Sequence, residues 1–141
     1  VPAHREGRTA MSTLPEVTTA RVEMAGGIGT LTLDRPERLN AMTNRMVVEV
    51  HDALSAIARM RDVRVLVLTG AGRGFCPGAD LKHFSAGGAD VATGPEHFRT
   101  PLLLHRMPQV TIAAINGACA GAGFGWACAC DLRFAARSAT F

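Results

Sequence analysis

Two glycine-rich segments contain the residues best suited to chemistry. Residues 70–78 read GAGRGFCPG, and residues 116–123 read NGACAGAG. Each follows an apolar run and leads into a segment that we expect to be helical. Such a turn presents backbone N–H groups, together with the positive end of a helix dipole, to a negative or developing negative charge. The sequence therefore predicts two anion-stabilising turns.

The spacing of the glycines argues against three familiar anion sites. Residues 70–74 and 121–125 both read Gly-x-Gly-x-Gly, whereas a dinucleotide-binding turn requires Gly-x-Gly-x-x-Gly. The sequence also lacks the Gly-x4-Gly-Lys-Ser/Thr phosphate loop and the Gly-x-Ser-x-Gly turn of serine hydrolases. The remaining use is one in which each turn donates an N–H group to the same oxygen atom.

Strands that could position these turns are predicted at residues 30–34, 63–69, 110–115 and 132–135. The first alternates apolar and polar residues, and Pro36 ends it because proline has no N–H for a strand ladder. The second is mostly β-branched or aliphatic, which is typical of a buried strand.

Helices are predicted between the strands. Thr43 is expected to cap a helix that runs to about Met60, because its apolar residues recur at steps of three and four. These residues are Met46, Val50, Ala53, Leu54, Ile57 and Ala58. A mobile loop is expected at residues 85–95 and another helix near residues 96–106. The alternation of strands and helices indicates an α/β fold with largely parallel pairing.

The two ends of the chain carry separate expectations. Residues 1–15 contain no continuous apolar stretch and are expected to form a disordered leader, with Met11 as a candidate start. The folded part is expected at residues 16–141. Because the last predicted strand ends close to Phe141, we expect the chain to be truncated before the architecture closes. Uncovered apolar faces would then favour association.

The composition excludes several classes of protein. The 141 residues are 48% hydrophobic and 19% charged, which excludes a disordered chain. The net charge is +3, and the densest cationic cluster, Arg59, Arg61 and Arg64, has no stacking aromatic residues, so no nucleic-acid partner is expected. No apolar run approaches the roughly 18 residues that span a bilayer, so no membrane partner is expected. The Cys128-x-Cys130 pair has no nearby histidine, which argues against zinc; we expect no metal, reduced thiols and a cytoplasmic location.

Four blocks of the sequence, taken together, resemble the crotonase (enoyl-CoA hydratase/isomerase) superfamily. They are residues 34–42, 74–82, 114–123 and 130–133, and they occur in the family's order. The resemblance extends over about residues 21–141. It implies a spiral of repeated ββα units, here without the C-terminal helical part, and an acyl-CoA thioester lying across it.

The resemblance also implies an oxyanion hole. In the family, one backbone N–H from each turn binds the thioester oxygen, and the matching residues here are Ala79 and Ala122. Two fixed donors stabilise an enolate more than the neutral thioester, which is how such a site accelerates a reaction. The neighbouring Gly78, Gly121 and Gly123 would permit close approach or positive φ.

Further substrate-binding residues follow from the same resemblance. They are expected to be Arg38, Leu39, Ala41, Gly78, Asp80, Leu81, Lys82 and Gly121. Arg38 and Lys82 are candidate contacts to the phosphates of coenzyme A, which is part of the substrate, and no other cofactor is expected. Asp80 is also expected to cap the helix that follows it, and Asp131 to anchor the start of a strand.

The chain departs from a typical hydratase of this family at the catalytic carboxylates. The first glutamate would lie three residues after Ala122, where the sequence has Gly125, and the second would lie beyond Phe141. Enoyl-CoA hydration remains the first expectation, since it is the commonest activity of the family. Double-bond isomerisation, or acyl-CoA binding without turnover, are the alternatives. The intact protein is expected to be a homotrimer or a dimer of trimers.

Overall fold

The computed structural model describes residues 14–88 and 90–141. The expected leader therefore lies outside the described residues, apart from Leu14 and Pro15. The strands of the described part are β1 (Ala20–Ala25), β2 (Ile28–Leu33), β3 (Val65–Gly70), β4 (Gly74–Cys76), β5 (Val110–Ile115), β6 (Ala118–Cys119) and β7 (Leu132–Ala135). The helices are α1 (Asn44–Ile57), α2 (Leu81–Ser85), α3 (Thr100–Arg106) and α4 (Gly121–Ala129), with short 3-10 turns at Pro36–Arg38 and His97–Arg99.

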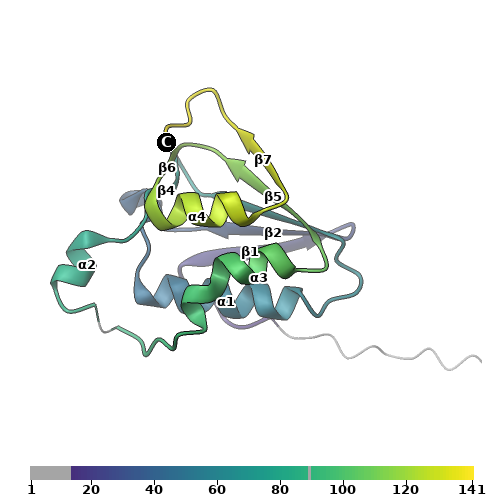
Figure 1. Ribbon diagram of the computed structural model, residues 1–141, viewed down its shortest axis with the longest axis horizontal. Helices are drawn as coiled ribbons and strands as arrows, with labels where there is room; N and C mark the ends of the chain where they lie inside the picture. Colours follow the sequence, from purple (N-terminus) through teal and green to yellow (C-terminus); the bar gives the residue numbers. More distant parts are fainter. Residues whose placement is uncertain (1–13, 89) are drawn as a thin grey trace, which may run out of the picture.

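The strands form one large sheet and one small one. The large sheet has the order β1-β2-β3-β5-β7, in which β1 and β2 are antiparallel and the other pairs are parallel. Each crossover moves one strand further in the same direction, so right-handed connections place the helices on one face. Figure 1 shows α1, α3 and α4 stacked along the sheet, and α3 packs against both of the others. The successive units β1-β2-α1, β3-β4-α2 and β5-β6-α4 confirm the expected spiral of ββα units.

The core lies between the large sheet and α1. Leu31, Leu66 and Leu68 are completely buried, as is the apolar face predicted for α1 except Ala58, which is half-buried. The cap was predicted correctly, because Thr43 Oγ1 accepts a hydrogen bond from the Met46 N–H at 3.2 Å. The helix ends at Ile57 rather than at Met60, and Gln109 Nε2 donates to the Ile57 carbonyl at that end.

Some elements differ from the sequence-based expectation. Strand β1 was not predicted; it pairs with β2 through a tight hairpin at Gly26 and Gly27, both with positive φ, and this pairing starts β2 at Ile28 rather than at residue 30. Strand β3 spans Val65–Gly70 rather than residues 63–69. The expected helix at residues 96–106 is a 3-10 turn followed by α3. Strands β5 and β7 have the predicted bounds.

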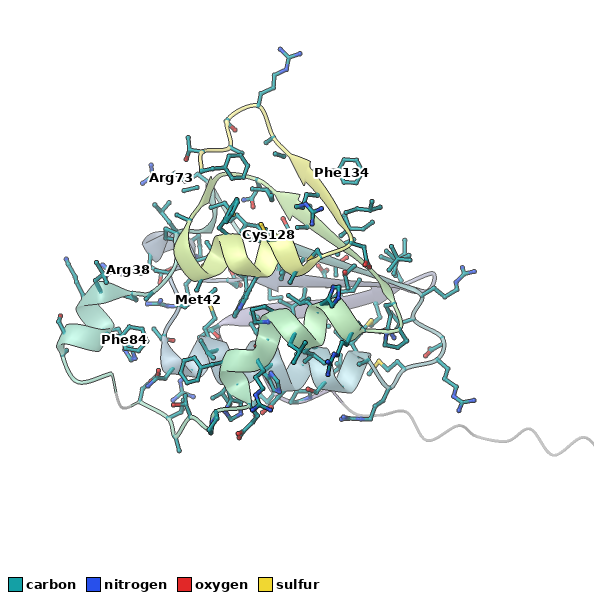
Figure 2. The ribbon with its side chains drawn as sticks, viewed as in Figure 1. Arg38, Met42, Arg73, Phe84, Cys128 and Phe134 are labelled. Atoms are coloured by element: carbon teal, nitrogen blue, oxygen red, sulfur yellow. The ribbon has the colours of Figure 1, made fainter. Side chains whose placement is uncertain are left out.

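The edge strand β7 leaves apolar side chains exposed. Leu132 is 47% exposed and Phe134 is 64% exposed, and Figure 2 shows Phe134 at the outer edge of the molecule. The association that such a surface favours stays a prediction. Within residues 14–88 and 90–141, no helix has both the length and the apolar character that crossing a bilayer requires.

Candidate active site

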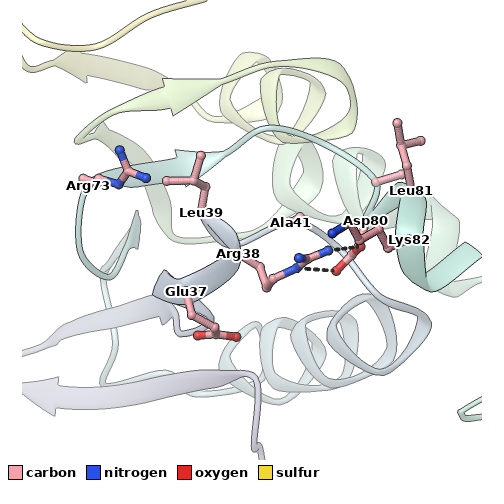
Figure 3. Close-up of a pocket in the computed structure, with 9 residues that line it drawn as sticks. Glu37, Arg38, Leu39, Ala41, Arg73, Asp80, Leu81 and Lys82 are labelled. Carbon is pink, nitrogen blue, oxygen red and sulfur yellow. Dashed lines mark hydrogen bonds and ion pairs between the residues drawn. The ribbon is translucent and has the colours of Figure 1, made fainter.

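A pocket of about 320 Å³ opens beside the first glycine-rich segment (Figure 3). The predicted residues that line it are Arg38, Leu39, Ala41, Ala79, Asp80, Leu81 and Lys82. Glu37 and Arg73 also line it, and neither was predicted. The position of Arg73 within the glycine-rich segment was the available signal for it. Gly78, Gly121 and Ala122 are not among the lining residues, so the pocket covers one part of the predicted site.

Asp80 is the electrostatic centre of this pocket. It is only 4% exposed and receives Arg38 Nη2 on Oδ1 at 3.0 Å and Arg35 Nη2 on Oδ2 at 3.2 Å. The hydrogen bond from Arg38 lowers the pKa of Asp80 well below its usual range, despite burial, and the same contact raises the pKa of Arg38. Asp80 Oδ1 also accepts the His83 N–H at 3.2 Å, which confirms the predicted cap of α2.

The pairing with Asp80 constrains one of the two cations that were predicted to contact phosphates. Arg38 is already held by Asp80 and is about one-third exposed, so its guanidinium faces both the carboxylate and the pocket (Figure 3). Lys82 is exposed on α2 and also lines the pocket. Both cations therefore line the same opening, and Arg38 is already paired with Asp80 there.

The first turn, at Gly78–Asp80, is held by a segment far away in the sequence. The Met42 N–H donates to the Gly78 carbonyl at 2.8 Å, and the Asp80 N–H donates to the Met42 carbonyl at 2.8 Å. These bonds form a parallel bridge between Met42 and Ala79. Figure 2 shows Met42 near Arg38, on the side of the molecule where α2 lies.

The second turn, at Ala120–Gly123, is held by close backbone packing. The Ala120 N–H donates to the Cys76 carbonyl at 3.0 Å. A β-carbon added at Gly123 would overlap that carbonyl oxygen and would lie 2.7 Å from the Cys76 β-carbon. Glycine is therefore required at 123 for α4 to begin against β4.

The two turns lie against each other. A β-carbon on Gly78 would be 3.5 Å from the Ala122 backbone nitrogen and 3.4 Å from the Ala120 carbonyl oxygen. Ala79 and Ala122 are both exposed, and within the described residues neither N–H donates to a protein acceptor. For Ala122 this follows from its place in the first turn of α4, where N–H groups have no partner within the helix. Two unpaired donors thus come from neighbouring turns.

Two asparagines hold the beginning of the first glycine-rich segment. Asn40 is completely buried, and its Nδ2 donates to the carbonyls of Ala71 at 3.0 Å and Gly74 at 2.8 Å. Asn116 Nδ2 donates to the carbonyls of Gly72 at 2.9 Å and Gly74 at 3.1 Å. Neither was predicted as a site residue, although both lie in the blocks that carried the resemblance.

The described residues provide no obvious acid or base at the second turn. Gly125 is half-buried on α4, and a β-carbon there would meet nothing within 4 Å. Asp131 Oδ2 accepts from the N–H of Thr111 at 2.8 Å and from its hydroxyl at 2.9 Å, which is the anchoring role predicted for it. Burial raises the pKa of Cys76 and of Cys130 to about 11, so both thiols stay protonated at neutral pH. Within residues 14–88 and 90–141, no cluster of His, Cys, Asp and Glu could hold a metal ion.

Comparison with known proteins identifies relatives of this chain. The family model described as "Enoyl-CoA hydratase/isomerase" matches residues 23–141. The chain is 42% identical to the 1,2-epoxyphenylacetyl-CoA isomerase of Escherichia coli over 121 residues, which is 82% of this chain and 46% of that protein. It is also 42% identical to a Rhodobacter capsulatus protein named "Probable enoyl-CoA hydratase", over 87% of this chain and 48% of the relative.

A solved structure agrees with these sequence matches. A Thermobifida fusca protein, crystallised in complex with acetoacetyl-CoA, superposes with a TM-score of 0.73 at 34% identity. The match covers 86% of this chain and 52% of the Thermobifida fusca chain. The chain spans about half the length of the curated relatives that it matches. The ββα spiral, the two glycine turns and these matches agree, and the chain belongs to the enoyl-CoA hydratase/isomerase family.

Proposed function

We propose that the Ala79 and Ala122 N–H groups form an oxyanion hole that stabilises a thioester enolate. The supporting observation is that these two donors have no partner among the described residues and come from turns that touch each other. Enolate formation puts negative charge on the thioester oxygen, and donors fixed in advance stabilise that charge without reorganising. Only backbone atoms act, so alanine at both positions is compatible with the role.

The substrate that we propose is an acyl-CoA thioester. Its phosphates would meet Arg38 and Lys82 at the mouth of the pocket, and its pantetheine would pass Leu39 and Ala41 toward Ala79. Asp80 orients Arg38 rather than handling protons, because two arginines and the His83 N–H already occupy its oxygens. Coenzyme A is part of the substrate, and no separate cofactor enters the proposal.

Double-bond isomerisation is the reaction that we place first, ahead of the hydration that the family resemblance put first. Hydration by this family would use a carboxylate at position 125, where this chain has glycine, whereas moving a proton along an acyl chain needs only one carboxylate. One relative is named as an isomerase, although its name describes an epoxide and not a double-bond shift. Hydration is the second candidate, because another relative is named as a hydratase.

The proposal can be tested with acetoacetyl-CoA, whose enolate has its own near-ultraviolet absorption band. The protein that carries this chain should lower the apparent pKa of bound acetoacetyl-CoA, so the enolate band should appear at a lower pH than in buffer. It should also convert a 3-enoyl-CoA to the conjugated 2-enoyl-CoA faster than it hydrates crotonyl-CoA. An unshifted enolate band would contradict the oxyanion hole. A shifted band with neither isomerisation nor hydration would indicate a module that binds acyl-CoA without turning it over.

The assembly is part of the same proposal. Acyl-CoA enzymes of this kind are expected to be homotrimers or dimers of trimers, and the exposed apolar side chains of Leu132 and Phe134 are available for burial. Sedimentation equilibrium of the protein that carries this chain should give a mass three or six times that of one subunit. A monomeric mass would contradict this part of the proposal.

A further inference from the structure

We propose that Arg35 is a positioning residue that fixes the direction of the Ala79 N–H. The inference rests on the proposed oxyanion hole. Arg35 does not line the pocket and was not predicted to contact substrate. Its effect would pass through two segments that it holds together, one at Ala41–Met42 and the other at Gly78–Asp80.

The first step is the geometry of the peptide that contains the donor. The Ala79 N–H and the Gly78 carbonyl belong to one trans peptide unit, in which they point in opposite directions. The Gly78 carbonyl accepts the Met42 N–H at 2.8 Å. The Ala79 N–H must therefore point away from Met42. A rotation of this peptide would break the bond to Met42 and would turn the donor out of the site.

The second step is the bond on the other side of Ala79. The Asp80 N–H donates to the Met42 carbonyl at 2.8 Å, so both peptides that flank the Ala79 α-carbon are fixed by the same residue. Gly78 has a φ of +103°, and glycine adopts positive and negative φ about equally readily, so local preference alone does not hold the turn in this shape. The position of Met42 relative to the turn therefore decides where the donor points.

The third step is what keeps Met42 in place. The Arg35 guanidinium donates from Nη1 to the Ala41 carbonyl and from Nη2 to Asp80 Oδ2, the latter at 3.2 Å. Ala41 precedes Met42, and Asp80 follows Ala79. The guanidinium of Arg35 thus bonds to a neighbour of each residue in the Met42–Ala79 bridge.

Arg35 is itself well fixed. Its N–H donates to Asn40 Oδ1 at 2.8 Å, and its carbonyl accepts the Asn40 N–H at 2.9 Å. Its side chain is only 18% exposed, compared with 35% for Arg38. Arg38 also bonds to Asp80, but none of its side-chain bonds reaches the Ala41 carbonyl. Within the described residues, Arg35 alone bridges the two segments with its side chain.

The experiment compares Arg35→Gln and Arg35→Lys with the unmodified protein that carries this chain. Lysine keeps the charge but lacks the planar fork, so it can hold only one of the two partners well. The readouts are the apparent pKa of bound acetoacetyl-CoA, the dissociation constant of coenzyme A, and kcat and KM. Coenzyme A has no thioester oxygen and therefore reports binding without the oxyanion hole.

Arg21→Gln is the matched control. Arg21 forms an Arg–Asp pair of similar length with Asp34, 2.9 Å from Nε to Oδ2, but it is 57% exposed and lies outside the pocket lining. Arg35→Gln should weaken enolate stabilisation and kcat about tenfold or more, since losing one oxyanion donor outright costs about 100- to 1,000-fold. For Arg35→Lys, enolate stabilisation and kcat should lie between those of the unmodified protein and those of Arg35→Gln. The affinity for coenzyme A should change less than about twofold in every variant.

Three results would overturn the inference. If both Arg35 variants stabilised the enolate as well as the unmodified protein, Arg35 would not position the donor. If they lost coenzyme A affinity and the enolate equally, its role would be general folding. Should Arg35→Gln fail to fold, Arg35→Lys decides the question on the same readouts. An unmodified protein that leaves the enolate band unshifted would refute the proposed oxyanion hole itself, and the inference with it.

Discussion

The two glycine turns of this chain are held in place by different means. The turn at Gly78–Asp80 is held by polar contacts from the distant residues Arg35, Arg38 and Met42. The turn at Ala120–Gly123 is held by one backbone hydrogen bond to Cys76 and by close contact between backbones, with no room for a β-carbon at Gly123. The first turn therefore depends on groups that contact it, whereas the second turn depends on the absence of a side chain at Gly123.

This difference teaches how each turn should respond to change. Side-chain contacts can be removed one at a time, and those to the Asp80 carboxylate depend on pH because a carboxylate titrates. Steric contacts do not titrate, and a single added methyl group breaks them. The predictions below use this contrast, beginning with the largest expected effect.

Gly123→Ala should be the most damaging substitution in either turn. The new methyl group would overlap the Cys76 carbonyl, so α4 would have to move away from β4. Overpacking of this kind costs about 3 kcal/mol, and here it would also displace the Ala122 N–H. Urea denaturation should show the loss of stability, and the enolate band of acetoacetyl-CoA should no longer shift.

Gly125→Ala is the matched control on the same helix. A β-carbon at 125 meets nothing within 4 Å, and alanine favours a helix interior over glycine by about 1 kcal/mol. This variant should therefore be as stable as the unmodified protein or slightly more stable. Equal destabilisation by the two alanines would contradict the steric account of the second turn.

Asp80→Asn should have an intermediate effect, confined to the first turn. Asparagine still caps α2, but it leaves Arg35 and Arg38 without a charged partner. Losing a charged hydrogen-bond partner at a buried site costs roughly 1–3 kcal/mol. Chemical denaturation at neutral pH measures this loss, and an unchanged midpoint would show that the ion pairs contribute nothing.

The pH dependence sharpens the same test. The pKa of Asp80 is lower in the folded protein than in the unfolded chain, where it is about 3.9. Its contribution to stability is therefore complete above about pH 4 and is lost as the pH falls toward the folded-state pKa. The stability difference between the unmodified protein and Asp80→Asn should be largest near pH 7 and should shrink below pH 4. A constant difference would exclude ionisation of Asp80 as the cause.

Gly78→Ala should have a small effect on stability and a large effect on chemistry. A positive φ costs a non-glycine residue about 1–2 kcal/mol. The added methyl group would lie 3.5 Å from the Ala122 nitrogen, on the residue whose peptide carries the Ala79 N–H. Coenzyme A should still bind in a calorimetric titration, while the enolate band should return toward its position in buffer. Normal enolate stabilisation by this variant would show that the donors do not share one site.

Local patterns predicted much of the scaffold. Thr43 and Asp80 were recognised as helix caps because the capping residue and its helix are adjacent in the sequence. The unpredicted strand β1 had a local signal as well, since its Gly26-Gly27 turn separates two runs that can form strands. Strands β4 and β6 contain only three and two residues, which is too short for periodicity to reveal them.

The positioning contacts could not be predicted in the same way. The bridge between Met42 and Ala79 joins residues far apart in the sequence, and nothing in the type of either residue indicates the other. Arg35 sits in a block that carried the resemblance, but its two partners become apparent only in three dimensions. The family resemblance indicated the candidate donors, whereas the contacts that fix the direction of the Ala79 N–H became apparent only from the fold.

The most direct test of the central claim is a crystal structure of the protein that carries this chain, with acetoacetyl-CoA bound. The account predicts one thioester oxygen within about 2.7–3.1 Å of both the Ala79 and the Ala122 nitrogens. A thioester oxygen bound to only one of these nitrogens, or to neither, would contradict it.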